Sequence, residues 1–340
     1  MNSWMSKRTE FETLLIERAD HVLMVTINRP DSANAMNTAL GRELLELFSG
    51  IIADPATARV VVLTGSGDRA FCAGADLKER QGMSDEQWNA QHYVFERMIR
   101  AIVDCPVPVI GAVNGAAFGG GCELALGCDF VYASRSARFA LTEVTLGIMP
   151  GAGGTQNLPR AVGSRRAKEL IYSGRPFSAE EAYAWGLVNR LCEPAALVRE
   201  TLAVAQTIAA NAPIAVRQAK RAIDLGTQMS LAEGMAFEIE AYGRMVGTED
   251  RREGSGPSTK SASRASRAAK SGRSGWIERR RHGGAGLLVC ATGCKTSRCS
   301  CLRSKRRIGS APSSLPGSRR SRSLPMCRRS CCSNSSMRRR

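Results

Sequence analysis

The sequence lacks the features that mark membrane, secreted and metal-binding proteins. No uninterrupted apolar run in the 340 residues is long enough to span a bilayer. Residues 1–12 contain no apolar core of the kind that a secretory signal peptide needs. No Cys and His residues in positions 1–250 have the spacing of metal ligands. We therefore expect a cytoplasmic protein that has no membrane segment and binds no metal.

The formal charge of +17 is distributed unevenly along the chain. From Arg251 onward there are 24 Lys and Arg residues against 2 Asp and Glu residues, a net charge of +22. The first 250 residues carry 24 basic and 29 acidic side chains, a net charge of −5. The basic character therefore belongs to the C-terminal segment and says nothing about the partners of the remaining chain.

The cysteines follow the same division. Five lie in apolar surroundings before residue 250, and seven lie in the last 90 residues. Scattered cysteines in apolar contexts are typical of buried, reduced thiols, which fits a reducing compartment.

Hydrophobic patterning predicts an α/β protein. Strands are expected within residues 13–28, as a pair around a polar turn, and at 59–65, 106–115, 129–134 and 138–141. Helices are expected at 39–54, 85–105 and about 120–127, and then at 164–172, 178–185, 194–211, 213–226 and 229–247. Alternating strands and helices, followed by helices alone, indicate an α/β core with a helical C-terminal region.

The stretch AAFGGGCELALGCDF, residues 116–130, places three glycines directly before a helix. The first amides of a helix have no internal partner, and glycines let a ligand oxygen approach them closely. Such amides could form half of an oxyanion hole for a thioester carbonyl. Glu123 follows one turn after Gly120, and it would either complement the helix dipole or act on the same ligand.

Two other stretches add to this candidate site. AFCAGADLKE, residues 70–79, follows a buried strand and offers a second turn of small residues with exposed amides. FALTEVTLGIMPGAGGT, residues 139–155, places Glu143 in apolar surroundings before a glycine-rich turn. An acidic residue in such surroundings needs either a partner or a chemical role.

With these stretches the sequence resembles the crotonase (enoyl-CoA hydratase/isomerase) superfamily, and within it the enoyl-CoA hydratases. The resemblance runs from about residue 11 to residue 254. Its motifs occur in order: NRPDSANAMN, FCAGADLKE, AVNGAAFGGGCELALGCD, LGIMPGAGGTQ, EAYAWGLVNR and GTEDRREG. It implies a spiral of ββα repeats over residues 1–195 and a helical trimerisation region over 196–254, with trimers or hexamers as the assembly.

The resemblance also implies roles for individual residues. The backbone N–H groups of Ala75 and Gly120 would form the oxyanion hole, and Glu123 and Glu143 match the two carboxylates of the hydratases. The turn that binds CoA would contain Ala73, Ala75, Asp76, Leu77 and Lys78. These matches imply a hydro-lyase of fatty-acid metabolism that adds water to a 2-enoyl-CoA thioester. It would need no cofactor, since CoA is part of the substrate.

Addition of water accounts for a pair of glutamates. One carboxylate takes a proton from water while the other group delivers a proton to Cα, so the two pKa values should differ. We expect Glu123 to activate the water and Glu143 to protonate Cα. Another reaction of the superfamily, chiefly double-bond isomerisation, is the nearest alternative.

Residues 255–340 are rich in Ser, Arg, Gly, Ala and Pro without periodicity, a composition typical of disorder. The superfamily ends soon after REG with a segment of the type A-F-x-E-K-R-x-P-x-F. Back-translation of residues 254–270 in a shifted frame can spell R-A-F-N-E-K-R-K-P-R-F-K-G-R and a stop. We therefore hypothesise a one-nucleotide frameshift or sequencing error near Gly254, and expect loss of the family ending to weaken CoA binding or assembly.

The segment 255–340 also admits two readings of another class. Its positive charge could serve as an electrostatic arm for nucleic acid, but it lacks regular aromatic interleaving. The cysteines of residues 290–301 could bind zinc, but their spacing is irregular. We therefore expect an acyl-CoA thioester as substrate and no nucleic-acid partner.

Overall fold

The computed structural model describes residues 11–255. The predictions of a disordered basic tail and of a frameshifted segment, and the rejected alternatives of a nucleic-acid arm and a zinc site, concern residues that lie almost entirely in 256–340, outside the described residues.

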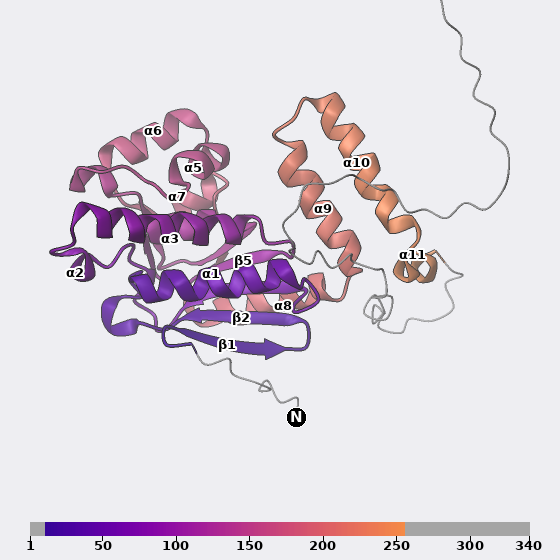
Figure 1. Ribbon diagram of the computed structural model, residues 1–340, viewed down its shortest axis with the longest axis horizontal. Coiled ribbons are helices and arrows are strands. Elements are labelled where there is room, and N and C mark those ends of the chain that lie inside the picture. The colour runs from indigo at the N-terminus through magenta and orange to yellow at the C-terminus, as the bar shows by residue number, and fades with distance from the viewer. Residues whose placement is uncertain (1–10, 256–340) are drawn as a thin grey trace, which may run out of the picture. The chain divides into compact units, whose positions relative to one another are not determined.

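Two sheets organise the fold, and Figure 1 shows part of the larger one. The six-stranded sheet contains, in spatial order, β1 (Leu14–Ala19), β2 (Val22–Ile27), β3 (Val60–Gly65), β5 (Val109–Val113), β7 (Phe130–Ser134) and β10 (Arg190–Cys192). The four-stranded sheet contains β4 (Ala70–Cys72), β6 (Ala116–Phe118), β8 (Arg138–Ala140) and β9 (Phe177–Ser178). The end pairs β1–β2 and β8–β9 are antiparallel, and the other pairs are parallel.

Successive strand pairs feed both sheets in turn. The pairs β3–β4, β5–β6 and β7–β8 each add one strand to the six-stranded sheet and the next strand to the four-stranded sheet. Helices follow these pairs and return the chain to the next repeat. This is the spiral of ββα repeats that the resemblance to the crotonase superfamily implied.

Eleven α-helices occur within residues 11–255. They are α1 (Thr38–Ala53), α2 (Leu77–Arg80), α3 (Asp85–Val103), α4 (Gly120–Leu126), α5 (Gly154–Val162), α6 (Ser164–Ser173), α7 (Ala179–Ala184), α8 (Leu197–Ala209), α9 (Pro213–Gly226), α10 (Leu231–Val246) and α11 (Glu249–Gly254). Three 3₁₀ helices, η1 (Pro30–Ser32), η2 (Glu143–Leu146) and η3 (Pro194–Ala196), complete the set. In these described residues, no helix has the length and apolar character needed to cross a membrane.

Local sequence explains the main elements. All six residues of β3 are buried, as expected for a central parallel strand whose two faces are both covered. Helix α1 begins after Asn37, whose side chain accepts a hydrogen bond from the N–H of Leu40. Helix α3 begins with a capping box formed by Ser84 and Gln87. These elements lie where the hydrophobic pattern predicted them.

Helix α8 packs against the six-stranded sheet, whereas α9 and α10 pack mainly on each other. Side chains of α8 pack in a second, smaller hydrophobic core, which includes Val60, Val62, Ile110, Ala112, Leu197 and Ala205. The domain boundary at residue 195 stays a prediction. Helix α8, the first α-helix after that residue, packs on the six-stranded sheet. Lys220 of α9 contacts the core through a 2.8 Å ion pair with Asp129.

Candidate active site

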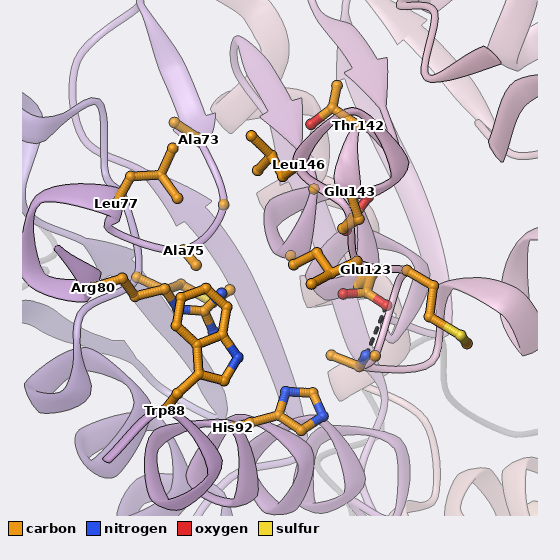
Figure 2. A pocket seen from close by; sticks show the side chains of 18 of the residues that line it. Ala73, Ala75, Leu77, Arg80, Trp88, His92, Glu123, Thr142, Glu143 and Leu146 are labelled. Carbon is orange, nitrogen blue, oxygen red and sulfur yellow. Dashed lines mark hydrogen bonds between the residues drawn. The ribbon is translucent and has the colours of Figure 1, made fainter. Parts of the chain in front are cut away.

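A cavity of about 530 Å³ lies among the segments that follow β4, β6 and β8 and one face of α3 (Figure 2). It is lined by Met36, Ala73, Gly74, Ala75, Leu77, Arg80, Trp88, Asn89, His92, Gly119, Gly120, Glu123, Thr142, Glu143, Leu146, Ile148, Met149, Gly151 and Ala152. The three stretches with candidate site residues, 70–79, 116–130 and 139–155, therefore meet in one cavity.

The three glycines at the start of α4, Gly119 to Gly121, each meet a different requirement. Gly119 has φ 52° and ψ −125°, a conformation that favours glycine. A Cβ at Gly121 would lie 1.9 Å from the carbonyl oxygen of Cys72, so the helix can pack on β4 only with glycine there. Gly120 is the first residue of α4 and lines the cavity. No described residue accepts a hydrogen bond from its N–H, which is the expected state of a helix-initial amide.

The turn after β4 brings a second free amide to the same place. The N–H of Ala75 also has no acceptor among residues 11–255, and Ala75 lines the cavity. Gly74, at φ 92°, lets the two turns touch, because a Cβ there would lie 2.8 Å from the carbonyl oxygen of Phe118 and 3.4 Å from the N of Gly120. Two unpaired N–H donors from separate turns thus lie beside one another at the cavity.

Glu123 lies in the first turn of α4 and is only 3% exposed. Its Oε1 accepts hydrogen bonds from the N–H groups of Ala152 and Gly154, each at 2.8 Å. Burial raises the pKa of Glu123, and these two N–H donors oppose that rise because they stabilise the charged form. The loop after β8 therefore fixes this carboxyl group through one of its oxygens.

Glu143 is the first residue of η2 and is 8% exposed. Neither carboxyl oxygen has a hydrogen-bond partner from another described residue. Burial raises the pKa of Glu143 to about 7, the backbone N–H of the same residue opposes this, and the charge of Glu123 adds to it. Glu143 is therefore a buried carboxyl group that no other described residue hydrogen-bonds and that gains or loses its proton near neutral pH.

The two carboxyl groups flank the glycine turn. A Cβ at Gly119 would lie 3.4 Å from Oε1 of Glu143, and one at Gly120 would lie 4.0 Å from Oε2 of Glu123. Figure 2 shows both side chains on one side of the cavity, with Ala73, Ala75 and Leu77 on the other. A small molecule held by the amides would thus lie next to both carboxyl groups.

Most of the predicted site residues line the cavity, and two lie elsewhere. Ala73, Ala75, Leu77, Gly120 and both glutamates belong to its lining. Lys78 and Asp76 do not.

Lys78 is exposed on α2. Asp76 caps α2 by accepting from the N–H groups of Lys78 and Glu79, and it pairs with Arg29 at 2.9 Å. Burial raises the pKa of Asp76, but the hydrogen bonds from Arg29 and the two amides lower it overall. The role of Lys78 and Asp76 in CoA binding stays a prediction.

The predicted site residues did not include Arg80 of α2 or Trp88 and His92 of α3, which form one wall of the cavity. Trp88 and His92, one helical turn apart, face the cavity, and the guanidinium of Arg80 lies 4.1 Å from the centre of a Trp88 ring (Figure 2). His92 packs on Gly151, where a Cβ would lie 2.5 Å from its Cε1. Their spacing of four residues along an amphipathic helix was the available signal, but it predicts core packing equally well.

Within residues 11–255, no three His, Cys, Asp or Glu side chains are grouped so that they could hold a metal ion.

Comparison with known proteins identifies the family of this chain. The sequence profile described as enoyl-CoA hydratase/isomerase matches residues 17–258. The chain belongs to this family. The short-chain-enoyl-CoA hydratase of Clostridium acetobutylicum is 41% identical over 244 residues, 72% of this chain and 93% of that protein. The crotonyl-CoA hydratase of Syntrophomonas wolfei is 39% identical over 244 residues, 72% of this chain and 94% of that protein.

A solved structure of the enoyl-CoA hydratase/isomerase family agrees with the fold. The 1.8 Å crystal structure of enoyl-CoA hydratase from Bacillus anthracis has a TM-score of 0.70 and 47% sequence identity to this chain, and the match covers 72% of this chain and 94% of that one. The crotonase fold expected from the motifs is thus confirmed.

Proposed function

We propose that this protein is an enoyl-CoA hydratase, which adds water across the 2,3 double bond of a 2-enoyl-CoA thioester to give a 3-hydroxyacyl-CoA. The observation that carries the proposal is the cavity in which two unpaired amides face two buried carboxyl groups with different surroundings. The names of the relatives, which include a crotonyl-CoA hydratase, support the same substrate class.

The amides of Ala75 and Gly120 receive the thioester oxygen. Addition of hydroxide at Cβ moves negative charge onto that oxygen as an enolate forms. Fixed N–H donors stabilise such charge by about 3–4 kcal/mol each, because they need no reorganisation when the charge develops. Two amides from separate turns also hold the thioester carbon in a defined place beside the carboxyl groups.

The two glutamates move the protons. Glu123, whose charged form is stabilised by the amides of Ala152 and Gly154, accepts a proton from water as the new C–O bond forms at Cβ. Glu143, whose pKa is raised to about 7, donates its proton to Cα as the enolate returns to a thioester carbonyl. A proton then passes from Glu123 back to Glu143 through solvent, which restores both carboxyl groups, so that one complete cycle adds one water. No cofactor besides the CoA portion of the substrate takes part.

The decisive experiment is hydration of crotonyl-CoA by the purified chain. We expect the absorbance of the conjugated enoyl thioester to disappear, with a product heavier by one water. A product of unchanged mass would instead indicate double-bond isomerisation, the nearest alternative. A second chain that ends in the shifted-frame segment is assayed in parallel. If neither folded chain reacts, the proposal is overturned; if only the second chain reacts, loss of the family ending disables the first.

We also propose that the chain assembles as a homotrimer or a pair of trimers through its C-terminal helices. Exposed apolar residues are concentrated on α9 and α10, including Ile223 at 64%, Leu231 at 81%, Met235 at 60%, Ile239 at 69% and Tyr242 at 61% exposed. An apolar surface of this kind is typical of a protein interface. Sedimentation of the full chain tests the assembly, and a monomer at micromolar concentration would contradict it.

For its location we propose the cytoplasm. Five cysteines among the described residues are free, and four of these are buried. Unpaired thiols in the core fit a reducing compartment. Fractionation of cells that express the chain tests this assignment.

A further inference from the structure

The turn that presents the amide of Ala75 is held by a short parallel bridge to the segment before α1. Met36 donates its N–H to the carbonyl oxygen of Gly74 at 2.7 Å, and Asp76 donates its N–H to the carbonyl oxygen of Met36 at 2.8 Å. Backbone groups of successive residues in such a bridge point to opposite sides. The bridge therefore turns the N–H of Ala75 away from Met36 and leaves it without an acceptor among the described residues.

One guanidinium ties together the two segments of this bridge. Arg29 donates to the carbonyl oxygen of Ala35 through Nη1 and to Oδ2 of Asp76 through Nη2, the latter at 2.9 Å. The side chains of Arg29 and Asp76 are only 18% and 12% exposed. Oδ1 of Asp76 accepts the first amides of α2, so the same carboxylate also sets where that helix begins. The fork of donors on arginine suits this double contact, which lysine could not reproduce.

The segment on the other side of the bridge is strained and is held in place by buried contacts. Ala33 and Asn34 have φ 51° and 55°, which non-glycine residues seldom adopt. Asn34 is 1% exposed; its Oδ1 accepts from the backbone N–H of Arg29, and its Nδ2 donates to the carbonyl oxygens of Ser66 and Ala70. Strain of this kind persists only where the surroundings enforce it, and it occurs often at functional sites.

We propose that Arg29, acting through Asp76 and the carbonyl group of Ala35, is a positioning residue that aims the N–H of Ala75 at the thioester oxygen. The proposal rests on the function proposed above. Neither Arg29 nor Asp76 lines the cavity, so neither is a catalytic residue. Loss of the pair would let the bridge shift and would weaken one of the two hydrogen bonds that stabilise the enolate.

The kinetic test uses Arg29→Gln and Asp76→Asn, the latter keeping an oxygen that can cap α2. We expect each variant to lose about tenfold to a hundredfold in kcat for crotonyl-CoA hydration. KM should stay within about threefold, and the double variant should lose no more than the worse single variant, since the two residues act as one unit. The matched control is Arg100→Gln, which removes an exposed ion pair with Glu96 outside the cavity and should leave kcat unchanged.

A spectroscopic test needs no turnover. The infrared carbonyl stretch of bound butyryl-CoA, a saturated thioester, should move to lower frequency in the unaltered protein because the two amides polarise it. In Arg29→Gln and Asp76→Asn the shift should be about halved, since one of two donors is misplaced.

The outcomes separate the two proposals. If the variants keep full kcat and the full carbonyl shift and lose only thermal stability, the pair is merely structural and the positioning role is overturned. If the unaltered protein hydrates crotonyl-CoA while only the variants lose the shift, both proposals hold. If the unaltered protein neither hydrates crotonyl-CoA nor shifts the carbonyl band, the proposed function itself fails, and the positioning role fails with it.

Discussion

Glu123 and Glu143 share one cavity, but the segments around them treat the carboxyl group in opposite ways. The loop after η2 gives Glu123 two backbone donors at 2.8 Å, whereas η2 buries both oxygens of Glu143 without a partner from another described residue. Burial raises both pKa values, and only for Glu123 do donors from a neighbouring loop oppose it. The fold thereby fixes the position of the Glu123 carboxylate and raises the pKa of Glu143. Such a difference between two carboxyl groups is found where one site needs both an acid and a base.

The largest expected effect is that of Glu143→Gln, which removes the proposed acid without changing the size of the side chain. We expect kcat for crotonyl-CoA hydration to fall about a thousandfold to ten-thousandfold, because the general acid for proton transfer to Cα is lost. Single-turnover kinetics measure it, with circular dichroism as a check on folding. A loss below tenfold would contradict the role given to Glu143.

Glu123→Gln should have a large but smaller effect. The oxygen of Gln can still accept hydrogen bonds from Ala152 and Gly154, so the loop keeps its place while the base is lost. We expect kcat to fall about a hundredfold to a thousandfold. If Glu123→Gln retained nearly full activity, the carboxylate would serve only to hold the loop, and the comparison between the two glutamates would lose its chemical meaning.

The third prediction concerns stability and pH. The pKa of Glu143 is about 7 in the folded protein against 4.5 as its ordinary value. Between these values the folded state binds more protons than the unfolded state, so this group makes the free energy of unfolding decrease as pH rises from 4.5 to about 7. Above about pH 7, the ionised Glu143 lowers the free energy of unfolding by on the order of 3 kcal/mol.

Glu143→Gln should therefore be more stable than the unaltered protein at about pH 8, by up to roughly 3 kcal/mol, and of similar stability near the ordinary glutamate pKa. Urea unfolding at the two pH values measures the difference. Glu123→Gln should gain less, because its carboxylate has two donors. Equal stabilities at the higher pH would show that Glu143 pays no desolvation cost.

The smallest effect is expected from Gly154→Ala. The added Cβ would lie 3.0 Å from Oε1 of Glu123 and from Cβ of Pro150, so it would displace the hydrogen-bonded carboxylate by a few tenths of an ångström. We expect about a tenfold loss of kcat, in line with small misplacements at other active sites. Gly50→Ala is the control, since nothing lies within 4 Å of a Cβ there. Equal activity of both variants would mean that the position of Glu123 is not critical.

Much of the fold could be predicted because long elements carry a clear period. The strand at Val60–Gly65 and the helices α1, α3, α9 and α10 lie within a few residues of their predicted ranges. The short strands β4, β6, β9 and β10 were missed, since two or three residues have no readable alternation, whereas β8 was predicted at 138–141. Helix α5 was also missed, because Pro159 lies inside it and glycines precede it.

The part of the candidate site that could be predicted consists of residues whose own sequence neighbours indicate a function. Gly120 and Glu123 share one helix turn, and Glu143 is an acid in apolar surroundings, so each could be selected from its own neighbours. The contributions of Trp88 and Arg29 depend on segments that only the folded chain brings together. Arg29 lies 47 residues before the aspartate that it pairs with, and nothing in the local pattern of either residue indicates the other.

The protonation of Glu143 tests the central claim most directly. Infrared spectra of the full chain across about pH 5 to pH 9 would follow the band of protonated carboxyl groups, with Glu143→Gln and Glu123→Gln measured in parallel. We expect one buried carboxyl group that loses its proton at about pH 7, and its band should be retained in Glu123→Gln and absent from Glu143→Gln. A band that disappears near the ordinary glutamate pKa, or that persists in Glu143→Gln, would contradict the assignment of Glu143 as the acid of the site.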